Sequence, residues 1–280
     1  MVDKAELIKM IEEISPPYLA ADWDNNGMQI EPASSDIERI LVALDLTPDV
    51  VSEAKEGGYD FVIVHHPIFF GESAAGRNIL QSDATGRLVY RLLSEPPGPI
   101  GVYAAHTSFD AAEGGLGDEL RRLVGLTPWD DRLHPDIAAE FSDIAPYVRI
   151  GHFTEPTDLA GAYAHVHKAL GGGADIRIFG EPGRNLLKVM TAPGGGGSAI
   201  PLAVKTGCSL LITGDIRHHE WRLAESENLA LIDAGHYYTE RPFSQLMATR
   251  LAEVLGQAYA NIVIDVSADI RQPYASASRA

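Results

Sequence analysis

Histidine and carboxylate side chains recur where apolar segments of the sequence end. His65 and His66 follow the apolar run 61–64, His106 follows 100–105, and His236 comes shortly after 229–233. Asp110 and Glu240 follow two of these histidines, and two further carboxylates, Asp45 and Asp215, stand at the ends of the apolar segments 39–45 and 209–213. Imidazole nitrogens and carboxylate oxygens are the usual protein ligands of divalent transition metals. The pattern therefore favours a metal site assembled from several segment ends.

The adjacent pair His65-His66 requires a specific local structure. Neighbouring residues in a strand point to opposite faces, so both imidazoles reach one site only if the strand ends there. Pro67 follows them and cannot donate a ladder hydrogen bond, which ends the strand. The alternative is one core histidine and one histidine exposed in a turn.

Two further pairs have ligand-like spacing. His106 and Asp110 are four residues apart on an expected loop, where they could bind a metal or cap the following segment. His236 and Glu240 share one helix face if a helix begins at His236. The alternative there is a His–Glu pair favoured by the dipole of a helix N-terminus.

Taken together, these residues suit two metal ions better than one. Three imidazoles (His65, His66, His236) and two carboxylates (Asp110, Glu240) exceed the needs of one tetrahedral zinc. Such a mixed set suits two metals about 3.5–4 Å apart that share a bridging carboxylate. Zinc, manganese, iron and cobalt are all chemically acceptable.

Other candidates are weaker. Asp215, His218 and His219 could support a ligand or face a substrate, or could simply form a polar helix start. The glycine-rich segment 192–200 could bind an anion, but it lacks the P-loop pattern, and a flexible turn is favoured. Cys208 begins an expected buried strand and has no basic partner, so we expect it to be inert.

Apolar runs alternate with amphipathic segments along the whole chain. An expected strand at 39–45, helix at 48–58 and strand at 59–64 predict parallel pairing, and the alternation continues to an expected strand at 260–267. In open α/β sheets, ligands bind beyond the carboxyl ends of the strands, which is where the histidines lie. An irregular stretch from 127 to 142 predicts a junction between two α/β domains, 1–126 and 127–280, each with a sheet flanked by helices.

Composition excludes several classes of protein. The 280 residues include 22 Lys and Arg against 39 Asp and Glu, a net charge of -17, which disfavours nucleic-acid binding. No apolar run is long enough to span a membrane. The N-terminal segment lacks a secretory h-region, and a single cysteine allows no intrachain disulfide. We therefore expect a cytoplasmic protein without nucleic-acid or membrane partners.

The motifs also resemble a known family. Trp23-Asp24-Asn25-x-Gly27, "ALDLT", "HHP", "HTSFDAAEGGLGDEL" and "GHYYTER" occur in the order seen in the Nif-three-like family, also called GTP cyclohydrolase I type 2. The resemblance implies two α/β domains with mixed sheets and a dinuclear metal site at their interface, in a homohexameric ring. It implies that the metal ligands are His65, His66, Asp110, His236 and Glu240, with Glu240 bridging. His106 would line the site as a weak ligand or a base.

A metal-dependent hydrolase is the leading functional hypothesis. Two divalent ions would activate water, His106 would transfer a proton, and the resemblance suggests a small-molecule substrate such as GTP, opened at its imidazole ring. The alternative is a metal storage or delivery protein, or a ring-shaped interaction scaffold, without catalysis. The segments 71–87 and 192–198 depart from the family pattern, which leaves the substrate open.

Overall fold

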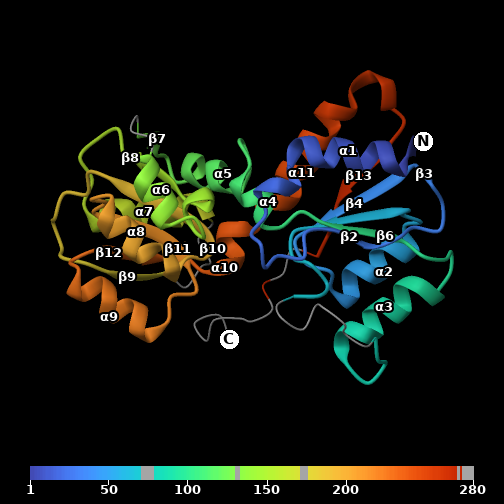
Figure 1. The fold of residues 1–280 in the computed structure, drawn as a ribbon, viewed down its shortest axis with the longest axis horizontal. Coiled ribbons are helices and arrows are strands. Elements are labelled where there is room, and N and C mark those ends of the chain that lie inside the picture. Colours follow the sequence, from blue (N-terminus) through green and yellow to red (C-terminus); the bar gives the residue numbers. More distant parts are fainter. Residues whose placement is uncertain (71–78, 130–132, 171–175, 270–271, 273–280) are drawn as a thin grey trace. The chain divides into compact units, whose positions relative to one another are not determined.

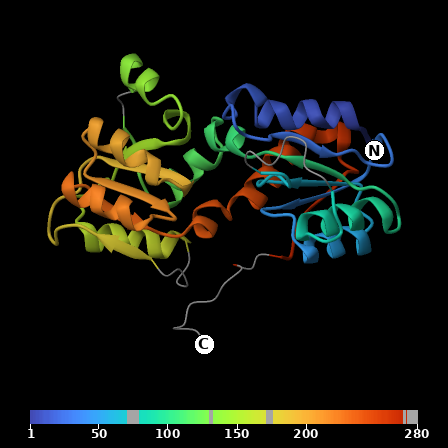
Figure 2. The same cartoon turned by 60° about the horizontal axis from the view of Figure 1, so that its bottom comes forward.

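The computed structural model describes residues 1–280 except 71–78, 130–132, 171–175, 270–271 and 273–280. The chain forms two compact units (Figure 1). The first consists of Met1–Gly115 and Phe243–Arg271, and the second mainly of Leu116–Pro242. This division differs from a single cut at residue 126, because the C-terminal strand returns to pair with a strand of the first unit (Figure 2).

The first unit contains a five-stranded sheet of order β13-β4-β5-β6-β2. The strands β13, β4, β5 and β6 are parallel and β2 is antiparallel to β6, so the predicted parallel pairing of the first strands is confirmed. A separate antiparallel pair joins β1 to β3. The bounds are β1 Val2–Asp3, β2 Gly27–Ile30, β3 Asp36–Ile37, β4 Arg39–Ala43, β5 Phe61–Val64, β6 Gly101–Ala104 and β13 Val263–Val266.

Helices flank both faces of this sheet (Figure 1). Helices α2 and α3 bury Val50 and Val89 against strand residues such as Val62, while α11 packs on the other face and α1 packs on α11. Helix α2 begins where its sequence predicts, because Thr47 Oγ1 accepts a hydrogen bond from the Val50 N–H at 3.1 Å. The helices are α1 Lys4–Ile14, α2 Pro48–Glu56, α3 Ala84–Ser94, α4 Thr107–Ala111 and α11 Phe243–Leu255, with 3-10 turns η1 Pro17–Leu19 and η4 Gly256–Tyr259.

The second unit contains a six-stranded mixed sheet of order β7-β8-β10-β11-β12-β9. The central strands β10, β11 and β12 are parallel, so their carboxyl ends share one edge. The outer strands β8 and β9 run antiparallel to their neighbours. The bounds are β7 Thr127–Pro128, β8 Arg149–His152, β9 Arg177–Phe179, β10 Val189–Gly195, β11 Leu210–Gly214 and β12 Ala230–Asp233.

Alternating apolar residues bury both faces of this second sheet. Leu210 and Ile212 pack against α5 and α7, whereas Leu211 packs against α8 and α9. The helices are α5 Leu116–Leu123, α6 Pro135–Glu140, α7 Leu159–Leu170, α8 Ile200–Lys205, α9 His218–Ser226 and α10 His236–Glu240, with 3-10 turns η2 Ala145–Tyr147 and η3 Gly197–Ala199.

Two expectations about elements need correction. The stretch 127–142, expected to be irregular, contains β7 and α6. The sequence pattern of 239–256 predicts one long helix, but the chain forms two helices there, α10 and α11, with Pro242 between them, since proline disrupts the hydrogen bonds of a helix interior. The sequence of the C-terminal tail, 272–280, predicts disorder, and this segment lies, from residue 273 on, outside the described residues. Within the described ranges, no helix has the length and apolar character needed to cross a membrane.

Candidate metal centre

In the first unit, strand β5 ends directly before His65 and His66. The backbone N–H groups of both histidines donate to the Leu44 carbonyl, at 3.1 and 3.2 Å, so the regular ladder stops at Val64. Both side chains therefore lie beyond the strand, and their ring centroids are 4.9 Å apart. His65 is fully buried, whereas His66 is partly exposed.

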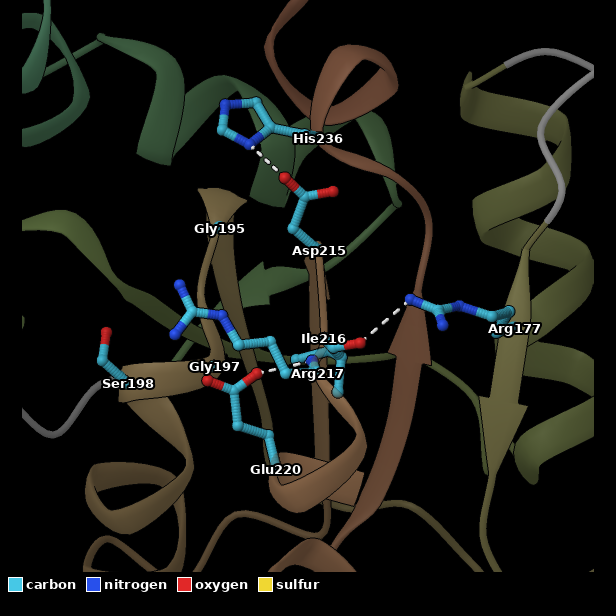
Figure 3. A pocket seen from close by; sticks show the side chains of 9 residues that line it. All are labelled: Arg177, Gly195, Gly197, Ser198, Asp215, Ile216, Arg217, Glu220 and His236. Atoms are coloured by element: carbon cyan, nitrogen blue, oxygen red, sulfur yellow. Dashed lines mark hydrogen bonds and ion pairs between the residues drawn. The ribbon is translucent and has the colours of Figure 1, made fainter. Parts of the chain in front are cut away.

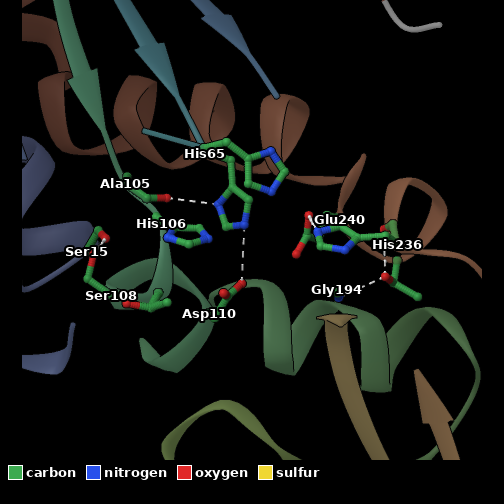
Figure 4. A network of polar contacts seen from close by, with 12 residues as sticks. Ser15, His65, Ala105, His106, Ser108, Asp110, Gly194, His236 and Glu240 are labelled. Carbon is green, nitrogen blue, oxygen red and sulfur yellow. Dashed lines mark hydrogen bonds and ion pairs between the residues drawn. The ribbon is translucent and has the colours of Figure 1, made fainter. Parts of the chain in front are cut away.

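His106 and Asp110 lie next to this pair, on a short helix and not on the expected loop. His106 precedes α4, and the Asp110 N–H donates to the His106 carbonyl at 3.2 Å, which places the two residues one helical turn apart. Asp110 Oδ1 is 3.7 Å from His65 Nε2. One nitrogen from each of His65, His66 and His106 lies within 4.8 Å of the other two. Figure 4 shows His65 and His106 of this group together with Asp110. The three histidines form a candidate ligand group within the first unit, and Asp110 lies beside His65.

In the second unit, His236 and Glu240 form a corresponding group. Helix α10 begins at His236, as the spacing predicts, and the preceding Gly235 has a φ of 86°, a conformation that favours glycine. His236 Nε2 and Glu240 Oε2 are 2.9 Å apart across one turn. The Glu240 side chain is buried. A metal in contact with both atoms would replace this direct contact.

The glycine-rich segment supports Glu240 and is not a free turn. Strand β10 extends through Gly195, and the Gly194 N–H donates to Thr239 Oγ1 at 3.0 Å (Figure 4). A Cβ atom on Gly194 would lie 2.2 Å from Glu240 Oε1, and the φ of Gly194 is +65°. Glycine at this position therefore allows the backbone to lie directly against the carboxylate.

Each candidate imidazole is held through its Nδ1 atom. The partners are all oxygens: Ala105 O for His65 at 3.0 Å, Asp45 Oδ1 for His66 at 2.8 Å, Asp24 Oδ1 for His106 at 2.8 Å, and Asp215 Oδ2 for His236 at 2.9 Å. Carbonyl and carboxylate oxygens only accept, so each Nδ1 carries the proton and the Nε2 of a neutral ring carries the lone pair. Metal-binding histidines are held in the same way in known sites.

Asp24 is the most deeply buried of these carboxylates, with a solvent-inaccessible side chain. Its Oδ2 also accepts from the Thr107 N–H at 3.1 Å and from Thr107 Oγ1 at 2.5 Å. Burial alone would raise the pKa of Asp24, but the hydrogen bond and charge of His106 and the two bonds from Thr107 hold this pKa below its ordinary value. Asp24 is therefore an anion at neutral pH and fixes the orientation of His106.

Sequence reasoning missed the roles of Asp24 and Asp45 and left that of Asp215 open. Asp45 and Asp215 could have been found from their positions at strand ends, 21 residues before the histidine that each one contacts. His218 and His219 do not join the group, since both are exposed at the start of α9. Their alternative interpretation as a polar helix start fits the structure.

These features define an α/β protein with imidazole–carboxylate groups that could bind a metal ion at the carboxyl ends of its strands. The chain belongs to the family Duf34/NIF3 (NGG1p interacting factor 3), whose model matches residues 2–273. This confirms the resemblance drawn from the motifs.

Relatives match over almost their full length. A GTP cyclohydrolase 1 type 2 homolog of Clostridium perfringens is 28% identical over 271 residues, covering 96% of this chain and 97% of the relative. A protein of the same name from Lactococcus lactis is 31% identical over 244 residues, covering 86% and 88%. A crystal structure of a Bacillus cereus protein related to NIF3 has a TM-score of 0.83 at 21% identity, covering 98% and 99%, and so shares the fold.

Proposed function

We propose that this protein is a hydrolase with two divalent metal ions, which acts on a nucleotide. The residues that would hold the ions are His65, His66, Asp110, His236 and Glu240. The observation that supports this proposal is the set of Nδ1 contacts of His65, His66 and His236, which orient these three imidazoles to bind through Nε2.

The donor set fits such ions chemically. Neutral imidazole nitrogens and carboxylate oxygens suit zinc, manganese, iron and cobalt. The carboxylates of Asp110 and Glu240 are both buried, and buried anions are costly unless positive charge compensates them. When bound, two divalent ions would acidify a water molecule and polarise a substrate carbonyl or phosphoryl group.

His106 is the proposed proton-transfer residue. Its ring is anchored by Asp24 at 2.8 Å and lies within 5.5 Å, centroid to centroid, of the rings of His65 and His66. The Nε2 atom can accept a proton from water or donate one to a leaving group, while Asp24 stabilises the imidazolium. Asp24 therefore positions His106, and His106 performs the transfer.

The names of the relatives suggest GTP as the first substrate to test. Purified, metal-loaded protein should release formate or phosphate from a panel of nucleotides that includes GTP. His106→Ala should lower this rate about 10²–10⁴-fold, the usual contribution of general acid–base catalysis. Its metal content should not change, because the five proposed ligands remain.

His134→Ala is the matched control, since His134 is an exposed histidine that lies 3.4 Å from an aspartate outside the proposed site. It should leave both the rate and the metal content unchanged. A metal-loaded protein without turnover on any nucleotide would contradict the hydrolase and favour metal storage or delivery.

A further inference from the structure

A pocket of about 670 Å³ lies in the second unit, beyond the carboxyl ends of β10 and β11 (Figure 3). Its lining includes Gly195, Asp215 and Arg217, with His236 at one end and Arg177 and Ser198 on its sides. The volume is within the usual range for small-molecule sites, about 300–1,000 Å³. The lining is mostly polar and charged, so the pocket does not suit an apolar ligand.

Two arginines supply positive charge to this pocket in an otherwise acidic chain. Arg177 is held in place by its Nη2 atom, which donates to the Ile216 carbonyl at 3.1 Å and also contacts the buried Asp233 carboxylate. The Arg217 side chain extends toward Ser198 (Figure 3). Within the described part of the chain, the guanidinium of Arg217 makes no hydrogen bond or ion pair, so its donors remain available to a ligand.

The carboxylates of the pocket already have structural roles. Asp215 accepts the hydrogen bond of His236 Nδ1 at 2.9 Å. Glu220 accepts the Arg217 backbone N–H at 2.6 Å and packs against Gly197, where a Cβ would lie 2.2 Å from the carboxyl carbon. These contacts offset part of the negative charge, whereas the fork of Arg217 matches the geometry of phosphate oxygens.

We propose that this pocket binds the phosphate end of the substrate, with Arg217 as the principal contact and Arg177 as a fixed second positive charge. The substrate class is then a phosphorylated compound. This inference rests on the proposed function, because His236 both lines the pocket and is a proposed metal ligand. The sequence alone shows no cluster of positive charge, because Arg177 and Arg217 are 40 residues apart. They come together at one edge of the second sheet because of the order of its strands.

Pyrophosphate binding to the full chain, after metal removal with EDTA, tests the pocket by isothermal titration calorimetry. Arg217→Ala should weaken the affinity about tenfold, equivalent to about 1.4 kcal/mol. Arg217→Lys should weaken it less, since lysine keeps the charge but loses the fork. Arg222→Ala is the matched control, because Arg222 lies on α9, the helix that Arg217 directly precedes, pairs with Glu225 and does not line the pocket.

An unchanged affinity in Arg217→Ala, or no saturable pyrophosphate binding to the wild type, would overturn the assignment. The folding of the variant is checked by its melting temperature, which should not shift because the side chain makes no contact that the fold needs. Metal content is measured in parallel. This metal measurement uses the metal-loaded protein before EDTA treatment. Pyrophosphate binding that depends on Arg217, in a protein that takes up no metal on loading, would support the pocket and contradict the proposed hydrolase. Two bound metals, together with pyrophosphate binding that Arg217→Ala does not change, would agree with the proposed hydrolase and contradict the pocket.

Discussion

An imidazole ring can bind a metal through either nitrogen. In this protein the hydrogen-bond partner of Nδ1 leaves Nε2 as the nitrogen that can bind. Three of the four candidate histidines have a carboxylate partner, and the fourth, His65, has the Ala105 carbonyl. A carboxylate partner also makes the distal nitrogen a stronger base and metal ligand. Some of the acidic residues of this chain therefore lie where they orient the Nε2 atoms of histidines for metal binding.

Removing a carboxylate partner should weaken metal binding without removing a ligand. Asp215→Asn and Asp45→Asn should each lower metal affinity about 10–100-fold, the usual effect of losing such a contact. Asp136→Asn is the control, because it alters an exposed histidine–aspartate pair outside the proposed site. Affinity is measured by competition with a chromophoric chelator. Equal affinities in all three variants would show that these contacts do not orient ligands.

Cys208 should react slowly with thiol reagents in the folded protein. Burial raises the pKa of its thiol above the ordinary value, so less thiolate is present at any given pH. Folding favours the protonated thiol, and this contribution to stability is complete below the unfolded pKa and is lost as pH rises through the folded pKa. Labelling with a disulfide reagent at pH 8, with and without urea, checks this. Equal rates in both states would contradict it.

At the residue scale, the sequence predicted the candidate ligands better than their partners. His65, His66 and His236 could be recognised because proline or glycine marks the ends of their segments. The Asp24–His106 contact joins residues 82 positions apart, and no local pattern indicates it. Such contacts depend on strand order, which becomes evident only in the fold.

At the scale of elements, the residues of the proposed site follow the carboxyl ends of parallel strands. Strand β5 leads to His65, β6 to His106, β11 to Asp215 and β12 to His236. The sequence predicted these strands, since apolar runs bounded by glycine and proline define them locally. It did not predict α4 or the return of β13 to the first unit. Helix α4 has only five residues, and the position of β13 depends on its pairing with β4.

Comparing Gly194→Ala with Gly207→Ala should separate the cost of placing a side chain in the left-handed region from the role of Gly194 in positioning Glu240. A residue with a side chain in the left-handed region costs about 1–2 kcal/mol, and both Gly194 and the control position Gly207 have such a φ, +65° and +71°. A Cβ on Gly207 meets nothing within 4 Å, whereas one on Gly194 meets the Glu240 carboxylate. Gly194→Ala should therefore be less stable than Gly207→Ala and should also displace Glu240.

The two glycine variants are compared by urea unfolding and by metal content. We expect Gly207→Ala to retain its metal and Gly194→Ala to lose it. Equal metal content in two folded variants would show that contact with Gly194 does not position Glu240.

At the scale of the whole molecule, the chain is an acidic α/β protein of the Duf34/NIF3 family. Its net charge of -17 makes local positive charge scarce, which gives weight to Arg177 and Arg217 in one pocket. The homohexamer remains a prediction from the family resemblance. Light scattering coupled to size exclusion tests it, with six times the chain mass of 30.2 kDa as the expected result.

The ratio of metal to protein tests the central claim most directly. Elemental analysis of the purified full chain, with protein measured by amino-acid analysis, should give two divalent ions per chain. His236→Ala, which removes one proposed ligand, should lower that ratio, whereas His134→Ala should not change it. A wild-type ratio of one or less after loading and removal of excess metal would contradict the two-metal centre.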